Sequence, residues 1–290
     1  MTGRIIRGVG GFYYVVSGDR VFVTKAAGIL RNRKMKPLVG DLVSFETLED
    51  GTGRITELLP RKSELIRPAV ANADRLVLVF SAVNPSPNFT ELNRYLISVE
   101  DLELPVFLVV TKSDLVKDAG RERILSAFRH TGYPIFFISS VTGEGIEEVG
   151  KALEHSVNVF SGPSGVGKSS FLNALVGHEA MEVGELSEKI GRGKNTTRHA
   201  ELFTLPNETF LLDTPGFTSV DIDFVKPENL ALMFHEMIPY TAKCRYPSCR
   251  HHKEPDCAVK AAVEAGMISE ERYQSYLTML THLSSLRRYS

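Results

Sequence analysis

The segment 162–169 carries the clearest chemistry in the sequence, because it reads Gly-Pro-Ser-Gly-Val-Gly-Lys-Ser. It follows an apolar run at 157–160 and precedes a helical pattern at 170–176. Glycines at this spacing let backbone N–H groups converge on phosphate oxygens at the N-terminus of a helix. Lys168 would neutralise the β and γ phosphates, and Ser169 would ligate Mg²⁺. The sequence therefore predicts a P-loop whose nucleotide ligands are Gly162, Gly165, Gly167, Lys168, Ser169 and Ser170.

A second motif, Thr111-Lys112-Ser113-Asp114, indicates which base accompanies the phosphates. It follows the apolar run 106–110 and is a variant of the Asn-Lys-x-Asp signature of guanine-nucleotide proteins. The Asp114 carboxylate can accept the N1–H and the exocyclic amine of guanine, whereas adenine has no N1–H. Lys112 would lay its stem on the base. The alternative is an ordinary strand-to-helix turn capped by Ser113 or Asp114.

Thr111 departs from that signature, because the usual residue at its position is Asn. The Asn amide normally ties the loop to the base and to the P-loop. We therefore expect this tie to be missing and the affinity for guanine nucleotide to be weakened.

A third loop, Ser139-Ser140-Val141, follows the apolar run 135–138 and resembles the Ser-Ala-Lys loop whose backbone N–H recognises guanine O6. The match is loose, but the order of the motifs strengthens it. Loops at the ends of consecutive parallel strands meet at one edge of a sheet, where nucleotides bind. Ser139 and Ser140 are therefore predicted to contact the base.

Two segments behind the P-loop could sense the γ-phosphate. The polar loop 191–198 offers Thr196 to the nucleotide and the Thr197 hydroxyl to Mg²⁺. In the segment Asp213-Thr214-Pro215-Gly216, Asp213 would face the metal shell and the Gly216 N–H the γ-phosphate. Each motif is common by itself, and the distance behind the P-loop favours this interpretation. The residues predicted to act in hydrolysis are Lys168, Thr197 and Gly216.

Phe217 follows Gly216 at the position where many GTPases carry a Gln that orients water. A phenyl ring cannot orient water. We therefore expect slow intrinsic hydrolysis, with stimulation by a partner or help from a polar group of the first switch.

All three cysteines of the chain lie in one short stretch with a histidine between them. Three thiolates and an imidazole form the ligand set of a closed structural zinc site, with no open position for catalysis. Reduced buried cysteines are the alternative, and His252 is the rival ligand to His251. The predicted zinc ligands are Cys244, Cys249, His251 and Cys257.

Hydrophobic patterns divide the chain into three parts, predicted as domains at 1–68, 69–222 and 223–290. The first shows short alternating runs at 12–16, 21–23 and 42–45, typical of a small antiparallel barrel of the oligonucleotide-binding type. The second alternates buried runs with helical patterns, typical of a parallel sheet with helices on both faces. A hairpin at 201–213 would add an antiparallel edge strand. The third predicts helices at 227–237 and 269–287.

Charge and aromatic residues point to nucleic acid at the first part. Residues 1–68 hold twelve Lys and Arg against seven Asp and Glu, a surplus suited to phosphate. Phe12, Tyr13 and Tyr14 could stack on bases, or they could be core. No apolar run reaches about 18 residues and no secretory signal is recognisable, so we expect a soluble cytoplasmic protein.

In chain order the motifs run base loop, second base loop, P-loop, first switch, second switch, a cyclic permutation of the usual order. With a barrel before them and Cys-x4-Cys-x-His-x5-Cys after them, the chain resembles the ribosome small-subunit-dependent GTPase A family over nearly its whole length. The resemblance implies a circularly permuted α/β P-loop GTPase domain between an N-terminal all-β OB-fold barrel and a C-terminal helical zinc-binding domain. It implies a GTPase that assists late maturation of the small ribosomal subunit and is stimulated by that subunit.

The same resemblance implies GTP or GDP, Mg²⁺ and one structural Zn²⁺ as cofactors. It implies the small ribosomal subunit and its rRNA as partners of a monomer, with no DNA or membrane partner. One departure concerns Asn195, because the family often places His there, before the paired threonines. Asn195 could still hydrogen-bond a water, and we assign no catalytic role to His199.

Two other functions stay open at the level of sequence. Phe217 and Asn195 are compatible with a nucleotide-gated binding module that barely hydrolyses GTP. A P-loop ATPase or kinase is opposed by Asp114. A further hypothesis follows from the permutation: the second switch leads directly into the C-terminal part, so nucleotide state could move that part.

Overall fold

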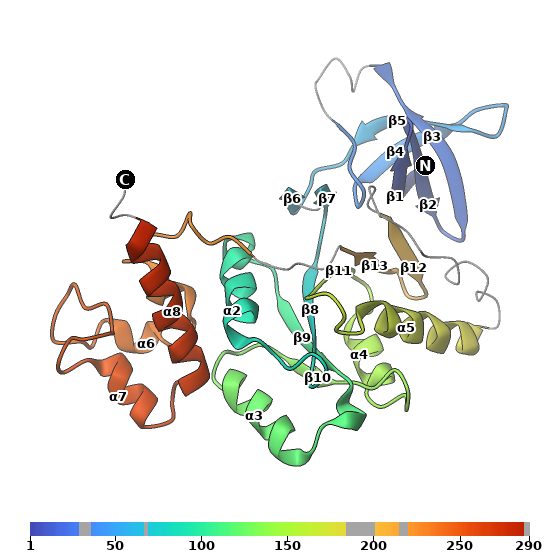
Figure 1. The fold of residues 1–290 in the computed structure, drawn as a ribbon. Helices are drawn as coiled ribbons and strands as arrows, with labels where there is room; N and C mark the ends of the chain where they lie inside the picture. The colour runs from blue at the N-terminus through green and yellow to red at the C-terminus, as the bar shows by residue number, and fades with distance from the viewer. Residues whose placement is uncertain (29–35, 67–68, 184–200, 215–219, 287–290) are drawn as a thin grey trace.

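The structure, a computed structural model, describes residues 1–28, 36–66, 69–183, 201–214 and 220–286 (Figure 1). A central sheet flanked by helices carries a barrel on one side and a helical tail on the other, so barrel and tail lie at opposite ends of the molecule (Figure 1). This arrangement confirms the predicted fold class. The helices that the structure describes are all too short or too polar to span a bilayer.

The N-terminal part is a closed five-stranded barrel with strand order β1-β2-β3-β5-β4. The strands are β1 (Thr2–Val9), β2 (Phe12–Ser17), β3 (Arg20–Ala26), β4 (Leu42–Thr47) and β5 (Gly53–Leu58). Successive side chains of a strand face opposite ways, so alternate positions fill the interior. Ile5, Val15 and Ile55 are fully buried there. The predicted barrel is confirmed, and it includes two strands, β1 and β5, that lie outside the three apolar runs of the prediction.

The three aromatic residues of β2 divide between the two faces of the barrel wall. Tyr13 packs against the barrel core. Phe12 is 40% exposed, and the ammonium of Lys25 lies 4.6 Å from its ring centroid. The Arg7 guanidinium lies 5.4 Å from the ring of Tyr14. One ring is therefore core, and two form an outward aromatic and basic face.

The central sheet has six strands in the order β10-β9-β8-β11-β13-β12. They are β8 (Arg75–Ser81), β9 (Val106–Thr111), β10 (Ile135–Phe137), β11 (Val157–Ser161), β12 (Leu202–Leu205) and β13 (Thr209–Asp213). All neighbours run parallel except β12, which pairs antiparallel with β13 at the edge. The predicted parallel strands and the edge hairpin are confirmed.

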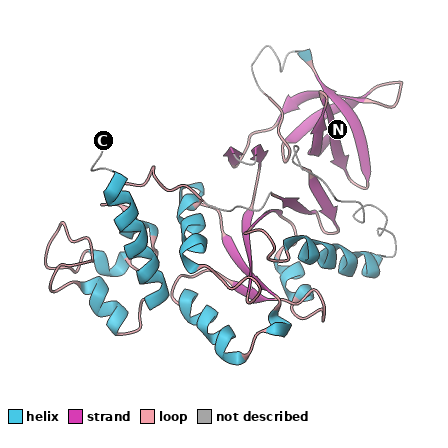
Figure 2. Cartoon of the chain, in the orientation of Figure 1, coloured by secondary structure: helices cyan, strands magenta, loops and turns pink. Residues whose placement is uncertain are grey.

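Helices cover both faces of this sheet (Figure 2). Helices α2 (Phe89–Ser98) and α3 (Asp118–Phe128) pack on the face that contains Leu76 and Leu78. Helices α4 (Ile146–Ala152) and α5 (Lys168–Val183) pack on the face that contains Val77 and Val79. Because both faces are covered, β8 reads as a continuous apolar run.

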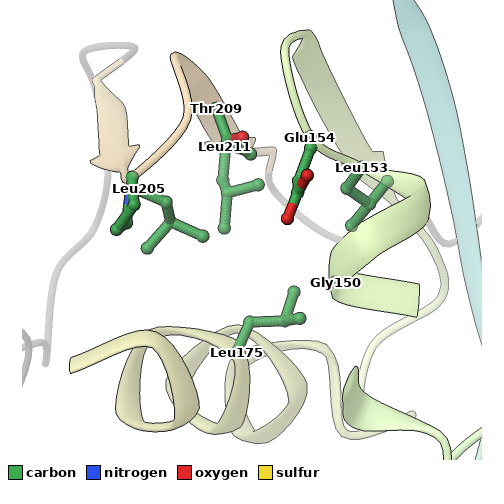
Figure 3. Close-up of a pocket in the computed structure, with 8 residues that line it drawn as sticks. Gly150, Leu153, Glu154, Leu175, Leu205, Thr209 and Leu211 are labelled. Atoms are coloured by element: carbon green, nitrogen blue, oxygen red, sulfur yellow. The ribbon is translucent and has the colours of Figure 1, made fainter. Parts of the chain in front are cut away.

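A small pocket opens between α4, α5 and the β12–β13 hairpin (Figure 3). Half of its lining residues are leucines, namely Leu153, Leu175, Leu205 and Leu211. Thr209 at the start of β13 also lines it, so the pocket lies at the amino-terminal edge of the sheet. The P-loop follows the opposite, carboxyl end of β11, so the pocket is separate from the phosphate site.

A short hairpin and isolated bridges connect the barrel to the sheet. Strands β6 (Glu64–Ile66) and β7 (Ala69–Ala71) pair antiparallel in the connecting segment. Arg7 of β1 forms an isolated antiparallel bridge with Glu201, just before β12, and the two side chains form an ion pair at 3.6 Å. The barrel therefore touches the edge hairpin of the sheet.

The tail consists of η3 (Leu230–Met233), α6 (Ile238–Thr241), α7 (Ala258–Glu264) and α8 (Glu270–Leu286). The helix predicted at 269–287 is confirmed by α8. The helix predicted at 227–237 is wrong, because this stretch forms only the short 3₁₀ helix η3 and turns. Leu230, Phe234 and Met237 are fully buried as a helical pattern requires, but Phe234 N–H bonds to Ala231 and Met237 N–H to Phe234. The apolar spacing therefore survives in a chain with i to i−3 bonding.

A buried arginine joins the tail to the central part. Arg272 of α8 donates two hydrogen bonds to Glu236, at 2.6 and 2.9 Å, and both side chains are 2% exposed. Arg272 also donates to Asn93 Oδ1 of α2 at 2.7 Å. The tail core includes Ile97 of α2. The tail is thus docked on α2 through buried polar and apolar contacts.

Candidate functional site

The P-loop connects β11 to α5, and two of its glycines adopt backbone conformations that other residues rarely take. Gly165 and Gly167 have φ of +76° and +92°. Gly162 is required for a different reason, since a Cβ there would overlap the backbone carbonyl of Val79. Helix α5 begins at Lys168, so the loop delivers its N–H groups to a helix N-terminus, as the motif predicts.

Lys168 is held at the mouth of this loop by the end of β13. Its side chain is 10% exposed, its ammonium pairs with the Asp213 carboxylate, and it donates to the Thr214 carbonyl at 2.5 Å. Asp213, predicted to face the metal shell, therefore contacts the P-loop lysine. Ser169 and Ser170 are exposed in the first turn of α5. The geometry brings a cation, a carboxylate and two hydroxyls to one corner of the sheet.

Thr111, at the end of β9, ties the first base loop to the P-loop. Its side chain is 2% exposed, and its hydroxyl donates to the carbonyl of Val166. The expectation that the tie to the P-loop is lost without Asn is therefore wrong, while the weakened affinity stays a prediction. A hydroxyl is shorter than an amide, but β9 and the P-loop lie close enough for it to reach. Only the three-dimensional structure reveals this closeness, because 55 residues separate the two partners.

Replacing Thr111 with Val is expected to weaken GDP binding about tenfold. Valine keeps the shape but leaves the buried Val166 carbonyl without this donor, a loss of about 1–3 kcal/mol. Titration with a fluorescent GDP analogue measures the change, and thermal unfolding reports any loss of stability. Thr111→Ser should stay close to the unmodified chain. Equal affinities for the Val and Ser variants would contradict this role.

Lys112 contacts the P-loop, and its place beside the base stays a prediction. It has φ of +58°, and its ammonium donates to the Gly165 carbonyl at 3.3 Å and to the carbonyl of Asn84. Sequence reasoning missed Asn84, which belongs to no motif and lies in the loop between β8 and α2. Its backbone carbonyl gives the lysine a second anchor.

Asp114 is exposed in η2 (Ser113–Leu115), beside this loop. The alternative interpretation of the motif required Ser113 or Asp114 to cap a helix. The residues at the caps of η2 and α3 are Lys112 and Lys117 instead. The capping alternative is therefore not supported, and the Asp114 carboxylate is accessible to a ligand.

The second base loop follows β10, the direct neighbour of β9. Ser139 is fully buried, and its hydroxyl oxygen accepts the N–H groups of Val141 at 3.2 Å and Thr142 at 3.1 Å. Ser140 is exposed. The two base loops are joined by a hydrogen bond of 3.0 Å from Ser113 N–H to the carbonyl of Ile138. Sequence reasoning also missed Glu144, whose carboxylate accepts a hydrogen bond from Ser113.

Three predicted residues, Thr196, Thr197 and Gly216, lie outside the described residues, as do Asn195 and Phe217. The assignments of these residues to the two switches stay predictions. The described end of the second motif, Asp213 and Thr214, adjoins the P-loop through Lys168.

The four donor atoms predicted to bind zinc converge in the tail, all within 4.8 Å of one another. Cys244 Sγ lies 3.8 Å from Cys257 Sγ, and each lies 3.4 Å from His251 Nδ1. A tetrahedral zinc site requires about 3.8 Å between sulfurs and about 3.6 Å between sulfur and nitrogen, given the usual metal–ligand distances. The sulfurs are too far apart for a disulfide. The cluster therefore fits Zn²⁺.

Burial and neighbouring groups explain why this cluster suits a cation. Burial raises the pKa of the Cys249 thiol to about 12, and the sulfurs of Cys257 and Cys244 add to the rise. Burial lowers the pKa of His251, which favours the neutral imidazole that metals bind. Thiolates packed this closely need a divalent cation to offset their repulsion. His252, the rival ligand, is exposed.

Helix α8 supports the cluster from behind. The hydroxyl of Tyr273 donates to the His251 carbonyl at 2.8 Å, and that of Tyr276 donates to the Arg250 carbonyl at 2.7 Å. Glu254 accepts the N–H groups of Arg250 and His252, both at 3.0 Å. Burial alone would raise the pKa of Glu254, but these backbone bonds lower it to about 2. The loop is thus held in shape by α8 and by an ionised carboxylate.

A P-loop after β11, with two base loops that precede it in the chain and adjoin it in space, defines a GTP-binding protein of the circularly permuted P-loop class. The family description "RsgA GTPase" matches residues 58–223, more than half of the chain, and "RsgA N-terminal domain" matches residues 2–55. The chain belongs to the RsgA GTPase family.

Two named relatives match this chain in sequence over nearly its full length. The small ribosomal subunit biogenesis GTPase RsgA of Alkaliphilus metalliredigens is 43% identical, with 99% of each chain covered. The protein of the same name from Clostridium perfringens is 42% identical, again with 99% of each chain covered.

Solved structures show the same architecture. The crystal structure of YloQ, described as a circularly permuted GTPase, is 33% identical with a TM-score of 0.78, covering 98% of this chain and 95% of its own. That of YjeQ from Thermotoga maritima is 32% identical with a TM-score of 0.80, covering 97% and 98%.

Proposed function

We propose that this chain is a GTPase that binds the small ribosomal subunit and its rRNA, assists late maturation of that subunit, and is stimulated by it. The observation that carries the guanine-nucleotide part is the hydrogen bond from Thr111 to Val166. It links the loop of Asp114 to the P-loop, although Asp114 comes earlier in the chain. The names of the relatives support the small subunit as the partner.

The proposed nucleotide site combines phosphate, base and metal ligands. Lys168, already held at the loop mouth, would move from Asp213 to phosphate oxygens, and Asp114 would accept the two N–H groups of guanine. Mg²⁺ bound by Ser169 and Thr197 would neutralise phosphate charge. The full set of proposed nucleotide ligands is Thr111, Lys112, Asp114, Ser139, Ser140, Gly162, Gly165, Gly167, Lys168, Ser169, Ser170, Thr196, Asp213 and Gly216. Lys168, Thr197 and Gly216 would stabilise charge during hydrolysis.

We propose one structural Zn²⁺ per chain, bound by Cys244, Cys249, His251 and Cys257. The distances between the donor atoms and their burial support this assignment. With four protein ligands the metal would have no open position, so it would stabilise the tail and take no part in hydrolysis.

The barrel is the proposed rRNA-binding part. Its outward face presents Arg7, Phe12, Tyr14 and Lys25 together, a combination that suits phosphates and stacked bases. The proposed domains are 1–68 for RNA binding, 69–222 for GTP and 223–290 for zinc. We further propose a monomer that acts in the cytoplasm without a DNA or membrane partner.

GTP turnover of the full chain tests this function when it is measured alone and with purified small subunits, large subunits or free RNA. Phe217 replaces the Gln that orients water, so turnover alone should be slow. Small subunits, and not large subunits, should raise it by about 100-fold or more, a modest share of what partners give other GTPases. Equal stimulation by both subunits would refute the proposed partner. Nucleotide-dependent binding to small subunits without turnover would favour the gated binding module instead.

A further inference from the structure

Glu144 belongs to none of the predicted motifs, yet it contacts both base loops and α3. Its backbone carbonyl accepts the N–H of Ser139 at 3.0 Å, which closes the second base loop. One carboxylate oxygen accepts the hydroxyl of Ser113 at 2.7 Å, and the other pairs with the guanidinium of Arg121 on α3. Through its carboxylate and its backbone carbonyl, Glu144 thus joins three elements around the proposed base site.

The partners of Glu144 are themselves fixed. Ser113 is 2% exposed and directly precedes Asp114 in η2. The guanidinium of Arg121 lies 5.2 Å from the ring centroid of Phe137 at the end of β10. Gly145, next to Glu144, has φ of +71°, and a Cβ there would overlap the carbonyl of Phe137. The backbone next to Glu144 is therefore constrained, and the two side chains that its carboxylate binds are held in place by their own surroundings.

The charge of Glu144 suits this position. The hydrogen bonds from Arg121 and Ser113 lower the pKa of its carboxyl group. An ionised carboxylate accepts hydrogen bonds more strongly than a neutral group. The bond to Ser113 is therefore a charge-assisted bond next to the residue that would read guanine.

We propose that Glu144 is a positioning residue for guanine recognition. Its carboxylate holds the Ser113 hydroxyl, and this fixes the direction of Asp114, one residue further on. The same carboxylate locks the second base loop to the first, so both loops approach the base together. Glu144 does not touch the nucleotide. The inference rests on the proposed GTP site.

The test compares GDP with inosine diphosphate, which lacks the exocyclic amine that Asp114 would bind. Removing the carboxylate with Glu144→Ala should raise the dissociation constant for GDP about tenfold, the value of one charge-assisted bond. The same variant should raise the dissociation constant for inosine diphosphate by a smaller factor. The preference for GDP over inosine diphosphate should therefore fall about threefold to tenfold. A loss of overall stability alone would weaken both ligands equally.

A double-mutant cycle identifies the partner through which Glu144 acts. Ser113→Ala should reproduce the loss of preference, and the double variant should be no worse than Glu144→Ala, because each single variant already removes the bond between Ser113 and Glu144. Glu144→Gln retains an acceptor for Ser113 and should restore most of the preference. Glu148→Ala removes the same charge from the exposed side of α4 and should bind like the unmodified chain.

Two other results would contradict either the role of Glu144 or the proposed guanine site. If Glu144→Ala keeps the full preference for GDP over inosine diphosphate, or weakens both ligands equally, Glu144 does not position Asp114. If the unmodified chain itself shows no preference for GDP over inosine and adenosine diphosphates, the proposed guanine site fails instead.

Discussion

Replacing Asp114 with Asn is expected to weaken GDP binding by about 100-fold to 10,000-fold. The carboxylate would accept two N–H groups of guanine, and each charge-assisted bond contributes about 1.5–3 kcal/mol. An amide offers only one acceptor and turns a donor toward one of these N–H groups. Xanthine carries a carbonyl where guanine carries its amine, so the same variant should bind xanthosine diphosphate more tightly than the unmodified chain does.

Calorimetric titration of both nucleotides against both proteins measures this exchange of specificity. Asp118→Asn is the matched control, because Asp118 is an exposed aspartate in the first turn of α3, four positions further along the chain. It should leave both affinities unchanged. If Asp114→Asn binds GDP as well as the unmodified chain does, the base lies elsewhere, and the permuted arrangement of the site is wrong.

Loss of the proposed zinc ion is expected to unfold the tail. Zinc binding at closed structural sites contributes about 10–16 kcal/mol to the folding free energy of small domains. The free energy of unfolding of a whole protein is of similar size, about 5–15 kcal/mol. In the described residues of the tail, long helical structure is limited to α8, and the loop 244–257 bends around the four donor atoms. Without the cation, three closely spaced thiols, one of them buried, would have to pack against one another with no group to bind.

The variants His251→Ala and His252→Ala give a matched pair for this prediction. The first should lose the single equivalent of zinc and make the tail sensitive to trypsin, and the second should keep both its zinc and its resistance. Metal content by mass spectrometry and the rate of cleavage within 243–260 are the measurements. If His251→Ala retains zinc and His252→Ala loses it, the imidazole ligand is His252, and the proposed assignment is wrong.

The docked tail limits the hypothesis that nucleotide state moves it. Residues that follow the second switch do enter the tail, since Ile222 is fully buried in its core. Yet Arg272 is bonded to Asn93 of α2 as well as to Glu236. Arg272 and Glu236 both belong to the tail, so their ion pair moves with it. A movement of the tail must therefore carry α2 with it, or break the hydrogen bond to Asn93 and the apolar contact with Ile97.

The sequence determined the features that depend on neighbours in the chain. The P-loop follows from glycine positions and the start of a helix, and the metal cluster from donor types at short spacing. The parallel strands follow from continuous apolar runs that both faces of a sheet require. The permuted order of the motifs is itself a property of the chain. These features need no knowledge of distant contacts, because local geometry and composition dictate them.

The tertiary structure decided the features that depend on residues far apart in the chain. Thr111 lacks the amide of the usual Asn, but the P-loop lies near enough for its hydroxyl to reach Val166. Glu144 acquires its place only because Ser113, 31 residues earlier, is brought beside it. The segment 227–237 keeps helical spacing without forming an α-helix, since burial against α8 satisfies its apolar residues whichever way its backbone bonds. The sequence specifies the chemistry of each side chain. Its partner depends on distances of a few ångströms between residues far apart in the chain, and these distances exist only in the folded protein.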